Sequence, residues 1–551
     1  MSSAPSPPAA AKETFTIVLD GKPVEVPKNL NLIEAARLGG VEIPYFCFHP
    51  RLSVVGQCRM CLVEIEGIPK IQAACTTPLK DGLSVKTTTE KVRKSRAANM
   101  EFLLINHPLD CPICDQAGEC TLQDNSFGYG TQLSNYDESK RQYPTFDRTP
   151  IGPHVIADMT RCIQCTRCIR FCQEIAGTSE LTFLDRGGRT LVWTHEGRPL
   201  ANDWSGCAAD VCPVGALTVR EFRFRSRVWY LHKSPSICPG CDIGCNISIE
   251  SKGDIVYRFL PRLNPEVNDY WLCDYGRFLS ESLNLRDVHK ASLRDGSEVR
   301  DASVPEAIAR IASEIRQTVE RSGPSAVLVV GSAYLSNEEN FLLRKIADHL
   351  GSPNRDVIVD ESRPRRIKSQ KEWLQGNHFG GNFRGAQEMG LVPGAGGYGL
   401  EAVLSGKAEP EVVLVGDAAF SVIADIPEKV AVLRRARFLA VAARTSSALT
   451  RAADVVLPAA SLAQKEGTFT NVQGRVQKFV RAFLPPAPIR AHWELFLLLA
   501  VALGWGDRKW TPADLRAQIS KEVERYGGVA EKELEGGTLL KKGDYAWKGA
   551  P

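Results

Sequence analysis

Cysteines are the residues in this chain whose type and spacing could do chemistry. Of 551 residues 17 are cysteine, and all of them lie between positions 47 and 273. Fifteen of these cysteines and one histidine fall into four ordered groups with the close spacing of metal ligands. A disulfide scaffold is normally a short secreted chain, and this chain is long, so the spacing favours metal binding in a reducing compartment.

The first group follows a pattern of predicted β-grasp elements. It consists of Cys47, Cys58, Cys61 and Cys75. Residues 15–26 are typical of a hairpin with an Asp20-Gly21 turn, and Asn31 caps a predicted helix over residues 32–38. A hairpin, a helix and then a cysteine loop is the layout of [2Fe–2S] ferredoxins, whose cluster needs four thiolates. A structural zinc site is the alternative for these thiols.

The second group combines one histidine with three cysteines. It consists of His107, Cys111, Cys114 and Cys120, and a predicted helix over residues 89–104 leads into it. The histidine completes a set of four ligands that the three cysteines alone would leave short. A neutral imidazole in place of a thiolate makes an iron–sulfur cluster less negative, which tends to raise its potential. Because three cysteines and a histidine are also a zinc set, zinc stays open at this group.

The third group contains more cysteines than one cluster needs. Cys162, Cys165, Cys168 and Cys172 match the C-x2-C-x2-C-x3-C run of bacterial ferredoxins, and Cys207 and Cys212 come later. In that run the fourth cysteine serves a second cluster, but no second run follows here. We therefore predict one [4Fe–4S] cluster on Cys162, Cys165, Cys168 and Cys212. Cys172 and Cys207 are then either buried thiols or remnant ligands of a lost second cluster.

The fourth group opens a region of different character. It consists of Cys238, Cys241, Cys245 and Cys273, and it follows a basic, aromatic connector at residues 223–230. Beyond it, strand-like runs that end in glycine alternate with helices, which indicates an α/β region with a parallel sheet. Gly394, Gly396 and Gly399 match a dinucleotide-binding pattern, but the strand that should precede them is missing. We interpret this stretch as a plain glycine loop.

Composition limits the possible partners. The formal net charge is +4 and the hydrophobic content is 43%, so neither nucleic acid nor a membrane surface is indicated. The Pro/Ser/Ala-rich start is predicted to be a disordered tail and lacks the pattern of a signal peptide. The apolar segment at residues 495–503 is too short to span a bilayer. We therefore expect membrane contact only through a partner.

The four groups, in this order, resemble the G subunit of respiratory NADH:quinone oxidoreductase (complex I). The specific motifs include Asn106-His-Pro-Leu-Asp-Cys-Pro-Ile-Cys and Arg161-Cys-Ile-Gln-Cys-Thr-Arg-Cys. The resemblance implies one [2Fe–2S] cluster on the first group and a [4Fe–4S] cluster on each of the other three. It implies electron transfer from a flavin/[4Fe–4S] NADH-oxidising subunit towards quinone, together with other hydrophilic-arm subunits. It also implies a place at the cytoplasmic face of a bacterial inner membrane, with no catalytic residue in this chain.

The region after the fourth group resembles a shortened molybdopterin oxidoreductase. In active members a lysine lies two residues after the fourth cysteine, where this chain has Tyr275, and no cysteine follows Cys273 to ligate molybdenum. We therefore expect no molybdopterin. The alternatives are an NAD-linked formate dehydrogenase α chain, an iron-only hydrogenase and a zinc-loaded scaffold. The cysteine-free C-terminal half counts against the first two of these.

A multidomain chain of α+β and α/β parts follows from these observations. The expected parts are a tail (residues 1–12), a β-grasp [2Fe–2S] domain (13–90), a [4Fe–4S] domain with one histidine ligand (91–135), a ferredoxin-like [4Fe–4S] domain (136–228), a further [4Fe–4S] domain (229–285), a trimmed molybdopterin-oxidoreductase-like α/β domain (286–505) and a C-terminal extension (506–551).

Overall fold

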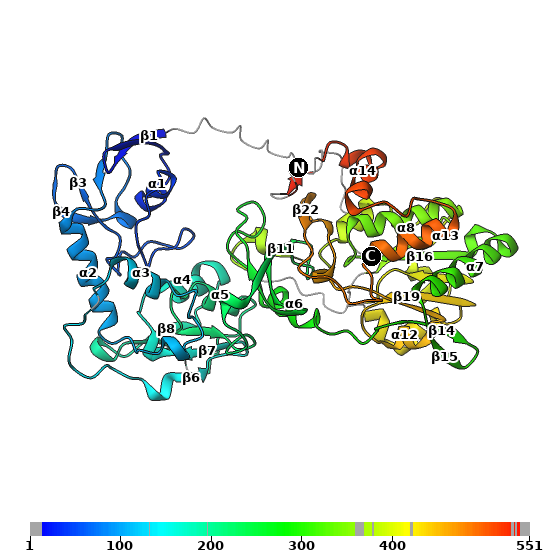
Figure 1. Ribbon diagram of the computed structural model, residues 1–551, viewed down its shortest axis with the longest axis horizontal. Coiled ribbons are helices and arrows are strands. Elements are labelled where there is room, and N and C mark those ends of the chain that lie inside the picture. The colour runs from blue at the N-terminus through cyan, green and yellow to red at the C-terminus, as the bar shows by residue number, and fades with distance from the viewer. Residues whose placement is uncertain are drawn as a thin grey trace. The chain divides into compact units, whose positions relative to one another are not determined.

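The chain folds into two compact units, residues 1–229 and residues 230–551 (Figure 1). The computed structural model describes residues 14–131, 133–195, 197–358, 369–376, 380–418, 422–529, 534 and 537–539. The predicted N-terminal tail lies outside the described residues, as does most of the chain beyond residue 529.

The first unit begins with a five-stranded sheet in the order β2-β1-β5-β3-β4, packed against helix α1. The strands are β1 Thr14–Leu19, β2 Lys22–Pro27, β3 Leu62–Ile65, β4 Ile68–Ala73 and β5 Ser84–Lys86. Asp20 and Gly21 both adopt positive φ (47° and 84°), as a tight hairpin turn requires. α1 (Leu32–Leu38) begins at Asn31, which forms a capping box with Glu34. The predicted hairpin, helix and β-grasp arrangement are confirmed.

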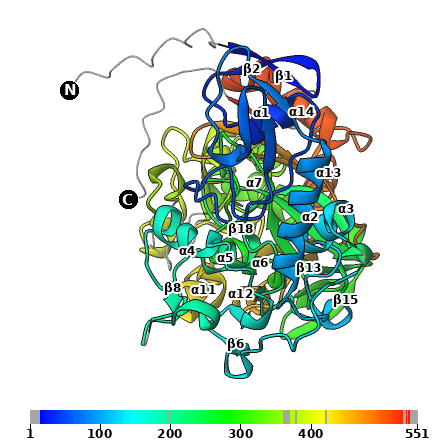
Figure 2. The ribbon, with the colours of Figure 1, turned by 90° about the vertical axis from the view of Figure 1, so that its left-hand side faces the viewer.

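Further helices and two small sheets complete the described part of the first unit. α2 (Glu90–Leu104) and α3 (Thr121–Tyr129) lie side by side (Figure 2). The remaining elements are β6 Asp147–Pro150, β7 Val155–Asp158, α4 Arg167–Phe171, β8 Leu181–Leu184, β9 Leu191–Thr194, α5 Ser205–Asp210 and β10 Leu217–Val219. α4 continues directly into a π-helical turn, Cys172–Ala176. β10, β7 and β6 form one sheet, and β8 pairs with β9.

The second unit opens with an antiparallel sheet and continues into a larger one. The antiparallel sheet consists of β11 (His232–Ile237), β12 (Asn246–Lys252) and β13 (Ile255–Pro261). Helix α6 (Asp274–Ser282) packs against β13. The larger sheet has the order β15-β14-β20-β19-β18-β16-β17. Its strands are β14 Ala291–Asp295, β15 Glu298–Ala302, β16 Val327–Ser332, β17 Arg355–Ile358, β18 Val412–Val415, β19 Phe438–Ala443 and β20 Val455–Pro458. Strands β16 to β20 are mutually parallel, whereas the β14–β15 hairpin adds two antiparallel edge strands that the sequence did not predict.

Helices cover both faces of this large sheet. Val327 and Val329 face a core shared with α7 (Val304–Ser322), α8 (Asn337–Leu350) and α13 (His492–Leu503). Leu328 and Val330 face the opposite core. That core is shared with α10 (Leu400–Leu404), α11 (Pro427–Leu433) and α12 (Ala448–Ala452). Alternate residues thus bury both faces, as parallel strands require.

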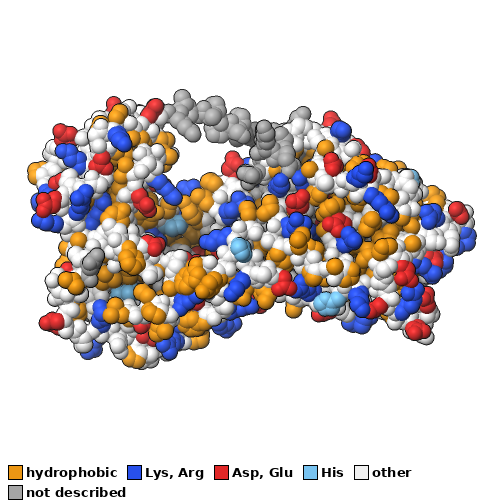
Figure 3. Space-filling model, viewed as in Figure 1, with side chains coloured by type: hydrophobic (Ala, Val, Ile, Leu, Met, Phe, Trp, Pro, Cys, Tyr) orange, Lys and Arg blue, Asp and Glu red, His pale blue; other side chains and the backbone are white. Residues whose placement is uncertain are grey.

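The remaining elements of the second unit lie around this core. They are α9 Phe383–Glu388, β21 Gly467–Thr470, β22 Arg475–Phe479, α14 Pro512–Glu522 and β23 Thr538–Leu539. Residues 391–399 contain no strand, which confirms the plain glycine loop. None of the helices in the described part of the chain has the length and apolarity needed to cross a membrane. Charged side chains of both signs are interspersed over the visible face of each unit (Figure 3).

Candidate metal centres

The first cysteine set comes together in the loop between α1 and β3 and in the turn after β4. The backbone N–H of Cys58 donates to Cys47 Sγ at 3.5 Å, and that of Phe46 donates to Cys58 Sγ at 3.4 Å. A hydrogen bond from Cys58 lowers the pKa of Cys47 to about 5. A hydrogen bond with Cys75, together with burial, raises the pKa of Cys61. The Cys47 thiol also acts electrostatically on Cys61 and Cys75, so the four sulfurs share one site.

The second set lies between the end of α2 and the start of α3. His107 Nδ1 is buried and has no hydrogen-bond partner. Burial, and then the charges of Arg161 and Lys140, lower the pKa of His107 to about 4. The imidazole is therefore neutral at pH 7, and its Nδ1 makes no hydrogen bond, which is the state that a metal ligand needs. The three thiols lie within electrostatic reach of one another.

The third set joins residues that are far apart in sequence. The thiols of Cys165, Cys162 and Cys212, when ionised, repel a negative charge on Cys168 more strongly than other groups do, so the four side chains lie near one another. Burial raises the pKa of both Cys162 and Cys212 to about 12, so these thiols stay protonated unless a cation compensates them. Iron supplies that positive charge when it binds, and metal binding deprotonates its thiol ligands. The donor set therefore fits an iron–sulfur cluster.

The two spare cysteines of the third region are both fully buried. Cys172 begins the π-helical turn after α4, and Cys207 lies in α5. The Cys172 side chain hydrogen-bonds with Thr178 and lies within electrostatic reach of Glu180 and Cys207. Burial raises the pKa of Cys172 to about 12, so it is an unreactive thiol at neutral pH. Whether either cysteine is a remnant ligand stays a prediction.

The fourth set lies at the start of the second unit. Cys238, Cys241 and Cys245 occupy the β11–β12 loop, and Cys273 caps α6. A Cβ at Gly276 would lie 2.8 Å from Cys238 Sγ and 3.5 Å from Cys273 Sγ, so this glycine leaves room for both sulfurs. The Gly276 N–H donates to Cys273 Sγ at 3.4 Å.

Tyr275 covers part of this fourth loop. A Cβ built on Gly240 would lie 3.0 Å from Tyr275 Cε1, so the tyrosine ring packs against the backbone between Cys238 and Cys241. An aromatic ring thus fills the place at which the resemblance puts a lysine.

Within the residues that the structure describes, no three His, Cys, Asp or Glu side chains are close enough to hold one metal ion together.

A small cavity lies at the edge of the large sheet at which a cofactor would be expected. Open α/β sheets bind ligands beyond the carboxyl ends of their strands. There, the described residues enclose a cavity of only about 30 Å³, lined in part by Asp417, Arg444, Lys465 and His492. Cofactor pockets usually measure about 300–1,000 Å³. This cavity is therefore too small to hold a molybdopterin.

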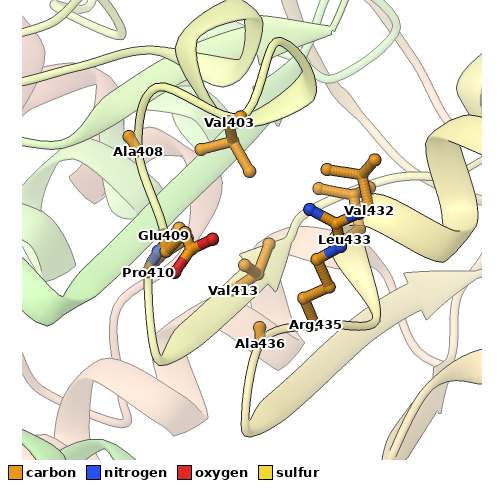
Figure 4. A pocket seen from close by; sticks show the side chains of 10 residues that line it. Val403, Ala408, Glu409, Pro410, Val413, Val432, Leu433, Arg435 and Ala436 are labelled. Atoms are coloured by element: carbon orange, nitrogen blue, oxygen red, sulfur yellow. The ribbon is translucent and has the colours of Figure 1, made fainter.

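A second pocket, of about 80 Å³, lies at the opposite edge of the same sheet. Val403, Val413 and Leu433 line it, with Glu409 and Arg435 on its two sides (Figure 4). It lies at the amino ends of β18 and β19, where sheets of this class do not usually bind ligands.

Sequence reasoning missed the polar side chains that link the cysteine loops of the first unit. Arg170 Nη2 donates to the carbonyl oxygens of Cys47 (2.6 Å) and Cys165 (3.3 Å). Gln57 Nε2 donates to the Gln164 carbonyl at 2.8 Å. A signal was present in the sequence, because arginines interrupt the third cysteine run at positions 167 and 170.

Five family models match the chain. They are "2Fe-2S iron-sulfur cluster binding domain" at residues 12–90, "NADH-ubiquinone oxidoreductase-G iron-sulfur binding region" at 96–134, "NADH-quinone oxidoreductase subunit 3, ferredoxin-like domain" at 152–218, "NADH-ubiquinone oxidoreductase NDSU1/NuoG-like, 4Fe-4S domain" at 233–281 and "Molybdopterin oxidoreductase" at 365–501.

Curated proteins similar to the chain include two respiratory proteins. The G subunit of NADH-quinone oxidoreductase from Rickettsia felis is 41% identical over 339 residues, which cover 62% of this chain and 50% of that protein. The mitochondrial NADH dehydrogenase [ubiquinone] iron-sulfur protein 1 of Solanum tuberosum is 40% identical over 345 residues, covering 62% and 46%. The chain thus spans about half the length of the curated relatives it matches.

Among solved structures, an NAD+-reducing [NiFe]-hydrogenase is 29% identical with a TM-score of 0.35, covering 39% of this chain and 91% of that one. The acetylene hydratase of Pelobacter acetylenicus is 12% identical with a TM-score of 0.41, covering 57% and 75%. The sequence relatives and the order of the iron–sulfur domains identify the family more specifically than these two structures do. On these grounds the chain belongs to the family of complex I iron–sulfur proteins that includes the G subunit of NADH-quinone oxidoreductase.

Proposed function

We propose that this chain conducts electrons within the peripheral arm of NADH:quinone oxidoreductase, from a flavin/[4Fe–4S] NADH-oxidising subunit towards quinone. The observation that supports the proposal is that the cysteines of each predicted set lie within electrostatic reach of one another, in four sets that follow the family order. When bound, iron–sulfur clusters supply one-electron redox chemistry, which needs no acid, base or nucleophile from the chain. The chain's own residues hold the iron, exclude water and donate N–H groups to sulfur.

The proposed ligands are the four sets named from the sequence. Cys47, Cys58, Cys61 and Cys75 hold one [2Fe–2S] cluster. The three [4Fe–4S] clusters are held by His107, Cys111, Cys114 and Cys120; by Cys162, Cys165, Cys168 and Cys212; and by Cys238, Cys241, Cys245 and Cys273. The neutral His107 ring, whose buried Nδ1 has no hydrogen-bond partner, supports the mixed set. The small size of the cavity at the sheet edge supports a C-terminal domain without molybdopterin.

Partners are proposed at the surface around the second set. Cys111 is exposed there, and Leu109 and Ile113 beside it are 87% and 53% exposed. Phe102 and Phe127, on the neighbouring helices α2 and α3, are 71% and 85% exposed. Large apolar side chains gathered at a surface favour a protein contact. We place another hydrophilic-arm subunit over this face, with any membrane contact made through the complex.

Metal analysis of anaerobically purified protein tests the proposal. We expect about fourteen irons and as many acid-labile sulfides per chain, from one binuclear and three cubane clusters. Co-purification should bring a flavin-binding subunit with the chain. Stoichiometric molybdenum or tungsten would favour the formate dehydrogenase alternative, and zinc without sulfide would favour a structural scaffold.

A further inference from the structure

Arg170 connects two cysteine loops that lie more than a hundred residues apart in sequence. It belongs to α4, and its side chain is buried, with 6% of its surface exposed. Nη2 donates to the carbonyl of Cys47 at 2.6 Å and to that of Cys165 at 3.3 Å, while Nη1 donates to the carbonyl of Ser53. One guanidinium therefore bonds directly to the backbone of a proposed ligand of the [2Fe–2S] cluster and of a proposed ligand of the third set.

Two neighbouring contacts join the same loops beside other ligand residues. Gln57, which precedes Cys58, donates to the carbonyl of Gln164, which precedes Cys165, at 2.8 Å. Arg167 Nη2 donates to the carbonyl of Phe48, which follows Cys47, at 2.6 Å. The two loops are thus held at several points within one residue of a ligand, and Arg170 is the side chain that bonds to ligand residues on both sides.

The charge of Arg170 acts on both sites as well. When ionised, as iron binding would make them, the thiols of Cys165 and Cys47 attract its guanidinium more strongly than the Glu174 carboxylate does. A guanidinium stays protonated in proteins, and its planar fork can hold two acceptors in a fixed geometry. A fixed positive charge near a redox centre stabilises the reduced, more negative state, and a buried one is poorly screened.

We propose that Arg170 is a positioning residue for electron transfer between the first and third sites. Its fork fixes the Cys47 loop against the Cys165 loop, and its charge raises the reduction potential at both sites together. This inference rests on the proposed function, because it requires iron–sulfur clusters at both sets. It adds a residue that coordinates no iron and yet couples two of the sites.

The test separates the fork from the charge with two variants of the full chain, purified anaerobically. Arg170→Lys keeps the charge but cannot span both carbonyls, and Arg170→Met removes the charge and the hydrogen bonds. Arg96→Met is the matched control, since Arg96 is also buried but donates only to the Leu62 carbonyl, beside the first set. The readouts are iron content, redox-titrated EPR of each cluster, and the magnetic relaxation coupling between the first and third clusters.

We expect Arg170→Met to lower both midpoint potentials, each by about tenfold in the equilibrium constant, or ~59 mV for a one-electron couple. Arg170→Lys should leave both midpoints near those of the wild type but reduce the magnetic coupling. Arg96→Met should leave the third cluster unchanged. If Arg170→Met alters neither midpoint and Arg170→Lys leaves the coupling intact, the proposal is wrong.

Two outcomes separate this inference from the proposed function. If the Arg170→Met protein loses iron, its midpoint potentials cannot be compared with those of the wild type. The magnetic coupling between the first and third clusters in Arg170→Lys then decides the question alone. If the wild-type chain itself lacks the EPR signals of a [2Fe–2S] and a [4Fe–4S] centre, the proposed function fails first. Wild-type signals together with a null result in both Arg170 variants would overturn only the role of Arg170.

Discussion

A buried ion pair in the C-terminal domain offers a direct test of how that domain is held together. Lys465 Nζ lies 2.6 Å from Glu339 Oε2, and the two side chains are 3% and 0% exposed. Glu339 also accepts a hydrogen bond from the Ser336 N–H at the start of α8. The perturbation is Lys465→Met, which keeps most of the length of the side chain and removes its charge. It leaves the Glu339 carboxylate buried without its cation.

The expected cost is large because a lone charge in the interior is poorly solvated. Removing one partner of a buried ion pair typically destabilises a protein by about 3–5 kcal/mol. For a domain of this size, ~1 kcal/mol shifts the unfolding midpoint by about 2 °C, so we expect a loss of about 6–10 °C. The double variant Glu339→Gln/Lys465→Met should recover most of this loss, since glutamine keeps the helix cap and leaves no charge buried.

Thermal and urea unfolding of anaerobically purified protein, with iron content recorded for each variant, provides the assay. Lys290→Met is the matched control, because Lys290 and Asp301 also lie 2.6 Å apart but are 63% and 69% exposed. This control should not move the midpoint measurably. A Lys465→Met midpoint equal to that of the wild type, or a double variant as unstable as the single one, would refute the reasoning.

Three further predictions concern single positions. His107→Cys should keep a cubane but lower its potential, because a thiolate adds negative charge; redox-titrated EPR in which no cluster shifts would contradict this. Cys172→Ala and Cys207→Ala should each leave the iron content intact, and a loss of about four irons would make that residue a ligand. Burial raises the pKa of Asp348, but hydrogen bonds from Arg344 and Arg355 outweigh this and lower it overall. Asp348→Asn should therefore be less stable than the wild type at pH 7. This difference should fade as pH falls below about 4, through the depressed pKa, and urea titrations at several pH values would measure it.

The sequence alone predicted the features that depend on a few neighbouring residues. The Asp20-Gly21 turn followed from residues that tolerate positive φ, and α1 followed from the Asn31 and Glu34 cap, because both are contacts within four residues. Cysteine spacing predicted the four ligand sets for the same reason. Each tight Cys-x-x-Cys group lies within four neighbouring residues, and the family order of the groups supplied the rest.

Only the tertiary structure decided which distant residues meet. It packed Cys172 near Cys207. It added the antiparallel β14–β15 hairpin to the edge of a sheet that sequence patterns predicted to be parallel. It also set Arg170 against Cys47, 123 residues away. Such contacts depend on how whole elements pack against one another, and no local spacing rule extends that far along the chain.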